Sequence, residues 1–116
     1  MSAESERKLG TVRIAPGVLV TIVSSAALGV AGVIRMGEAS RLDGPGLGRI
    51  FHRDENSGVK IEVHEEKVQA DLYLVVSKEA NMHALGKQVQ SDVSKAIRYM
   101  VGMPVEQINV YIQNVE

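Results

Sequence analysis

Cations and glycines that could bind an anion are concentrated in one segment of the sequence, residues 37–58. Glycines stand at positions 44, 46 and 48, and the neighbouring side chains that can carry positive charge are Arg41, Arg49, His52 and Arg53. Backbone N–H groups in such a loop can surround a phosphate or carboxylate, and nearby cations add attraction. A phosphate loop, however, leads into a helix that opens with lysine and then serine or threonine, and no such lysine follows here. We therefore expect either an anion-binding loop or, by default, a flexible glycine loop without a ligand.

Nucleophilic catalysis and metal binding are not indicated elsewhere in the sequence. The tripeptide His52-Arg53-Asp54 resembles part of a kinase catalytic loop, but the flanking motif is missing and 116 residues are too few for a kinase. No two of the three histidines have the i, i+4 spacing of a helical metal site. The chain has no cysteine, which excludes a thiolate nucleophile, a cysteine zinc site and a disulfide framework. We therefore predict a protein that is not an enzyme and that has no cofactor and no metal.

An uncharged stretch near the start of the chain is the more informative feature. From Ile14 to Ile34 the sequence runs 21 residues without a charged side chain, which is nominally long enough to span a bilayer. Pro16 is typical of the first turn of a helix, and Gly29 and Gly32 interrupt the pattern after about four turns. We therefore predict a helix from Pro16 to about Leu28 and no insertion into a membrane.

This predicted helix is a candidate protein interface. A helix packed on a sheet ordinarily shows a charged stripe to water, whereas apolar and small residues nearly encircle this one. Either the segment 37–58 covers it, or it contacts a second copy or a partner protein. Two tyrosines on the predicted outer face of the sheet form a second candidate patch, because tyrosine is enriched in interfaces, although ordinary surface is the default there. The candidate interface residues are Leu19, Thr21, Val23, Ser24, Ser25, Tyr73 and Tyr111.

The elements that position these residues follow from hydrophobic periodicity. Alternation with period two predicts strands at 11–14, 33–36, 59–64, 68–76 and 108–113. A second helix is predicted after Asn81, a good N-cap, and it should stop at Gly102. Residues 65–67 lack a tight-turn signal, so we expect a slightly longer connection there. The order predicts an α+β two-layer sandwich, with a mostly antiparallel sheet of four to five strands and two helices on one face.

Composition limits the size and the partners of this fold. The chain is long enough for one domain with its own core, and we assign residues 1–9 to a flexible lead-in and 10–116 to a single domain with a long loop at 37–58. Because the formal net charge is −1, nucleic acid is not an expected partner. The absence of cysteine fits a reducing compartment.

Several segments in this order resemble the alkaline shock protein family, also called the envelope stress response family of Gram-positive bacteria. The resemblance covers residues 10–115 and is carried by Gly10–Ile14, Gly29–Val33, Gly58–Val63, Val68–Val76, Val89-Gln90, Met100–Gly102 and Asn109–Val115. Relatives usually carry Glu or Lys along the first helix, and this chain carries neither there. The Tyr-Gly pair often found before the second helix is Glu79-Ala80 here.

The resemblance implies a cytoplasmic, non-enzymatic protein, peripheral at the inner face of the membrane when it is bound there. Members of this family bind a membrane-anchored relative, assemble into polymers, or affect lipid synthesis. We therefore expect a scaffold of the envelope stress response that binds itself or a membrane-anchored envelope protein. The alternative is a regulator that binds a small ligand or anion through the glycine-rich loop.

Overall fold

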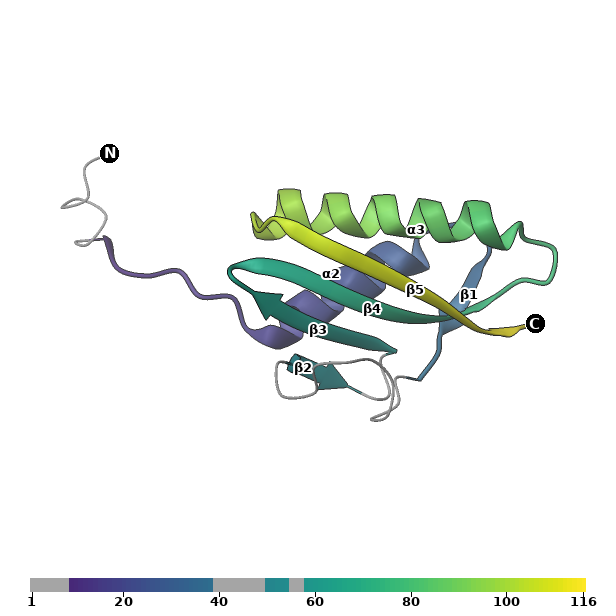
Figure 1. Cartoon of the computed structure of the whole chain (residues 1–116), viewed down its shortest axis with the longest axis horizontal. Helices are drawn as coiled ribbons and strands as arrows, with labels where there is room; N and C mark the ends of the chain where they lie inside the picture. The colour runs from purple at the N-terminus through teal and green to yellow at the C-terminus, as the bar shows by residue number, and fades with distance from the viewer. Residues whose placement is uncertain (1–8, 39–49, 55–57) are drawn as a thin grey trace.

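The computed structural model describes residues 9–38 and 58–116, together with the backbone of residues 50–54. Within this part of the chain, two helices lie on one face of a five-stranded sheet (Figure 1). The elements are α2 (Pro16–Leu28), β1 (Val33–Met36), β2 (Ile50–Asp54), β3 (Val59–His64), β4 (Lys67–Val76), α3 (Met82–Ala96), the π-helical turn η2 (Ile97–Val101) and β5 (Val105–Val115). The predicted α+β architecture is confirmed.

Strand β4 is the centre of the sheet. Strands β3 and β1 pair along one edge of it, both antiparallel, and β2 extends the sheet beyond β3. The two strands meet at Tyr73, whose N–H donates to the carbonyl of Gly58 and whose carbonyl accepts from Gly37. Strand β5 pairs parallel along the other edge of β4. A parallel partner is possible because helix α3 crosses over between the two strands.

A single aliphatic core fills the space between the helices and the sheet. Both helices and three strands supply it, and its fully buried members include Val23, Ile61, Leu72, Leu74 and Val89. Helix α3 begins as predicted, because the Asn81 side chain accepts a hydrogen bond from the N–H of Ala84 at 3.0 Å. It ends in the turn η2, after which Gly102 adopts a left-handed conformation with φ of 81°.

Three predictions about local structure are wrong. Residues Thr11–Ile14 form no strand, and they lead into α2 as an exposed coil. The loop expected over 37–58 contains a strand, because residues 50–54 form β2; residues 39–49 and 55–57 lie outside the described part, as do residues 1–8 of the predicted lead-in. The connection between β3 and β4 is a two-residue turn, with Glu65 and Glu66 at φ of 51° and 67°. Positive φ at both central residues is the geometry of a type I′ hairpin.

Candidate protein interface

Helix α2 presents an uncharged face to its surroundings. The inner side of the helix is buried through Leu19, Val20, Val23 and Ala27. On the other side, Val18 is 45% exposed and Leu28 is 47% exposed, and Thr21 and Ser25 between them are also exposed. These four positions follow one another at the spacings of three and four residues that keep side chains on one side of a helix. We call the four residues, Val18, Thr21, Ser25 and Leu28, the outer face of α2.

The hydroxyl groups of this region are already paired within the helix. The hydroxyl of Thr21 donates to the carbonyl of Gly17 at 3.0 Å, and that of Ser24 donates to the carbonyl of Val20 at 2.6 Å. Hydroxyls bonded back to the preceding turn make a smaller demand for water than free ones. The outer face of α2 is therefore less costly to cover with apolar surface than its sequence suggests.

The predicted interface residues on this helix separate into two groups. Leu19 and Val23 are 2% and 0% exposed and belong to the core, so neither contributes to the surface of the folded chain. Thr21 and Ser25 are exposed, and Ser24 is half-buried.

Two members of the outer face are absent from the predicted interface. The periodicity assigns Val18 to the apolar stripe and Leu28 to the helix end, whereas both are about half exposed. Their spacing of three residues from Thr21 and Ser25, respectively, is the signal that could have found them.

The two predicted tyrosines come together on the opposite face of the sheet. Their rings stack with centroids 5.0 Å apart and an interplanar angle of 17°, and the Lys60 ammonium lies 5.5 Å from the centre of the Tyr73 ring. Tyr73 is only 5% exposed, whereas Tyr111 is 42% exposed. The sheet lies between this pair and α2, so the two candidate patches are separate surfaces.

A row of buried polar residues lies beside the tyrosines. Lys60 pairs across the sheet with Asp71, and Asp71 pairs with Asn109. The Asn109 amide donates to the Asp71 carboxylate at 2.8 Å, and the carboxylate of Glu62 lies 3.0 Å from Nε2 of His64. Among the described residues, every buried side-chain nitrogen or oxygen has a hydrogen-bond partner. The row therefore stabilises the sheet by mutual pairing.

The residues predicted for anion binding are only partly placed. Arg41 and Arg49 lie outside the described residues. His52 and Arg53 belong to the backbone of β2, where Arg53 pairs with Lys60. Within the described part of the chain, no group of three His, Cys, Asp or Glu side chains could hold a metal ion.

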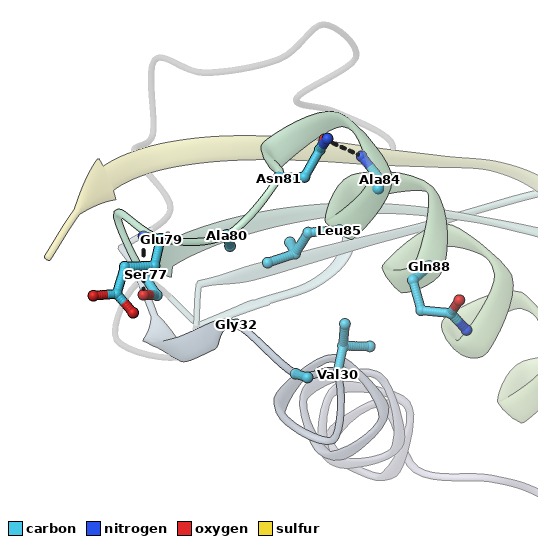
Figure 2. A pocket seen from close by; sticks show the side chains of 10 residues that line it. Val30, Gly32, Ser77, Glu79, Ala80, Asn81, Ala84, Leu85 and Gln88 are labelled. Carbon is cyan, nitrogen blue, oxygen red and sulfur yellow. Dashed lines mark hydrogen bonds between the residues drawn. The ribbon is translucent and has the colours of Figure 1, made fainter.

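One open hollow lies between the end of α2 and the start of α3. It encloses about 520 Å³, and its lining includes Val30, Gly32, Ala80 and Leu85. Figure 2 shows that the side chain of Asn81 is turned toward the backbone of its own helix, where it caps Ala84. The hollow thus has an apolar floor without a set of polar groups that converge on it, which a small-molecule site ordinarily has.

Comparison with known proteins places these features in a family context. Residues 4–116 match the model of the alkaline shock protein family, which is described as having a cell envelope-related function. The chain is 27% identical over 116 residues to "Uncharacterized protein YloU" of Bacillus subtilis, with 99% of this chain and 96% of the relative covered. It is 28% identical over 109 residues to "Uncharacterized protein YqhY" of the same organism, covering 93% and 78% of the two chains.

Solved structures show a similar fold. The structure titled "MamM CTD - Copper form" superposes with a TM-score of 0.60 at 17% identity and covers 87% of each chain. The structure titled "MamM CTD D249N - Zinc form" gives a TM-score of 0.56 at 17% identity, with 86% of each chain covered. At this identity the likeness concerns the fold alone. No helix in the described residues is long and apolar enough to cross a membrane.

Proposed function

The chain belongs to the alkaline shock protein family, and on that premise we propose that it is a non-enzymatic scaffold of the envelope stress response that works by self-association. The contact between copies is the outer face of α2, formed by Val18, Thr21, Ser25 and Leu28. The proposal includes a cytoplasmic location, and a peripheral position at the inner face of the membrane when the protein binds a membrane-anchored envelope protein.

The observation that carries this proposal is the charge-free outer face of a helix that is already anchored in the core. All 13 residues of α2 are uncharged, and the cores of protein interfaces are depleted of charge relative to other surface. Val18 and Leu28 supply apolar area at the two ends of the face. Gly17 and Ser25, which have small side chains, leave room for the close approach of another helix.

The pairing of hydroxyls within α2 supports the same proposal. A buried hydroxyl without a partner costs about 1–3 kcal/mol, and this cost opposes the burial of most serine- and threonine-rich surfaces. Because Thr21 and Ser24 donate within their own helix, a second copy can cover them without that penalty. Two such faces related by a twofold axis would form a closed dimer.

Light scattering after size exclusion tests the proposal with charges placed on the outer face. Val18→Glu and Leu28→Glu should each convert an oligomer to a monomer, because two like charges would face each other across the contact. Ser91→Glu is the matched control, since Ser91 is exposed on α3 and the change should leave the oligomer intact. Circular dichroism must show that all three variants are folded. A wild-type protein that is monomeric at high concentration would overturn the proposal.

A further inference from the structure

A segment with the sequence of a strand lies outside the sheet. Thr11–Ile14 has three β-branched residues of four, and Val12 and Ile14 alternate with Thr11 and Arg13. In the structure these residues form a coil that runs away from the sheet and helices (Figure 1). Val12 is 92% exposed and Ile14 is 38% exposed, and Leu9 before them is 75% exposed. The segment thus offers apolar side chains and backbone hydrogen-bonding groups to another molecule.

The sheet offers an edge that such a segment could extend. Within the described residues, β5 pairs only with β4, so its other edge presents backbone N–H and C=O groups outward. The carbonyl of Ile108 is on this edge, where it accepts a hydrogen bond from the Gln90 side chain at 3.1 Å. Because a strand repeats with period two, the backbone groups of Val110 and Ile112 point the same way. The available edge therefore begins just beyond Gln90.

A groove lies alongside this edge. It encloses about 400 Å³ between β5 and the flank of α3, and its lining includes Val110 and Ile112 from the strand and Met82 and Gly86 from the helix. Met82 is 40% exposed. At Gly86 no atom lies within 4 Å of the position that a Cβ would occupy. The absent side chain leaves the groove open at its middle.

We propose that Thr11–Ile14 of one copy adds as a strand to the β5 edge of a second copy, with Val12 and Ile14 in the groove beside α3. Side chains of an added strand alternate between the two faces of the sheet. When Val12 and Ile14 point toward α3, Arg13 lies on the opposite face, where Tyr111 is 42% exposed. A guanidinium beside an exposed tyrosine ring gains a cation–π attraction. Both faces of the segment thus meet matching chemistry.

This inference deepens the proposed self-association, on which it rests, by adding a second contact between copies. A contact between α2 faces joins like surfaces and closes after two copies. Strand addition joins unlike surfaces, so that each copy can donate to the next and extend the assembly. The two contacts are tested separately, because Val18→Glu removes one and leaves the other.

Alternation between the sheet faces gives the first test. The chain contains no cysteine, so each introduced thiol is the only one in its copy. Val12→Cys is mixed in turn with copies carrying Val110→Cys or Ile112→Cys, on the α3 side, and with copies carrying Tyr111→Cys or Gln113→Cys, on the other side. Oxidation should give disulfide heterodimers with the first pair of acceptors and several-fold less with the second. Equal yields with all four, or no heterodimer, would overturn the proposal.

Complementation gives the second test, carried out in the Val18→Glu background. Val12→Pro removes a strand N–H from the donor, and Gly86→Leu fills the groove of the acceptor. Each change alone should raise the Kd of association at least about tenfold, which corresponds to the loss of roughly one good hydrogen bond. Mixed together, the two variants retain one intact donor and one intact groove, and they should form a one-to-one heterodimer. Leu9→Pro is the control that leaves Thr11–Ile14 unchanged.

The results also separate this contact from the proposed function. If Val18→Glu dissociates the wild-type assembly and Val12→Pro has no effect, strand addition is overturned and self-association through α2 stands. A chain that remains monomeric throughout overturns both contacts. A monomer that sediments with phosphatidylglycerol vesicles, and loses this when Val12 becomes proline, would overturn strand addition and assign the exposed segment to a lipid surface.

Discussion

The orientation of α2 can be tested by comparing two chemically identical substitutions on its two sides. Val23 is 0% exposed in the core, and Val18, on the outer face, is 45% exposed. Valine to alanine removes two carbon atoms at either position. In the core this loss of buried area costs about 1.6 kcal/mol, at about 0.8 kcal/mol per carbon. The cavity left behind adds about 1 kcal/mol.

Helix propensity acts in the opposite direction at both positions. Alanine is favoured over valine in a helix by about 0.5 kcal/mol, which reduces the net cost of Val23→Ala to about 2 kcal/mol. The same gain at Val18 offsets the small area lost there, so Val18→Ala should change the free energy of unfolding by less than about 0.5 kcal/mol. A difference of about 2 kcal/mol corresponds to a decrease in Tm of about 8 °C for a domain of this size.

Urea unfolding followed by circular dichroism measures this difference. The experiment should be run at submicromolar protein concentration, where self-association contributes little to stability. At high concentration, Val18→Ala should additionally lower the fraction of oligomer. Equal unfolding free energies for Val18→Ala and Val23→Ala at low concentration would refute the assignment of the two sides of the helix.

Three further substitutions test local features of the fold, each by urea unfolding. Replacement of Glu65-Glu66 by Asn-Gly should raise the free energy of unfolding by about 1 kcal/mol, because both residues have positive φ; an unchanged value would argue against the type I′ turn. Asn81→Ala should lower it by about 1 kcal/mol through loss of the N-cap, and Asn81→Ser should restore most of that. Gly32→Ala should cost about 2 kcal/mol or more, since φ is +98° and the new Cβ would lie 2.7 Å from a side-chain carbon of α3. Gly86→Ala, where nothing lies within 4 Å, should be stabilising; destabilisation by both would contradict the described space.

The helices were predictable because their boundaries depend on local chemistry. Pro16 begins α2, Asn81 caps α3, and Gly102 ends the second helix in a left-handed conformation. Each effect acts over a few neighbouring residues, so one sequence is enough to reveal it. Hydrophobic alternation likewise revealed β3 and β4, because both strands have one face against the core.

The errors arose where tertiary pairing decides. Thr11–Ile14 has the composition of a strand, yet no edge of its own sheet receives it. Strand β2 lies within a glycine-rich polar stretch, and its pairing with β3 outweighs its weak local signal. The turn at Glu65-Glu66 is imposed by the register of two well-determined strands rather than by turn residues.

The candidate interface was only partly predictable, because a helix without charge carries no mark of which side faces water. A charged stripe ordinarily provides that information. Without it, core residues such as Leu19 and Val23 could not be separated from surface residues such as Thr21 and Ser25. On the sheet, alternation correctly placed Lys60 opposite the core, but nothing in the pattern indicated that the residue would be only 2% exposed.

Sedimentation equilibrium of the wild-type protein over a wide concentration range is the most direct test of self-association. The account predicts a mass that rises above the 12.5 kDa of one chain as the concentration increases, and a smaller rise for Val18→Glu. A single species of 12.5 kDa at every concentration would contradict the account.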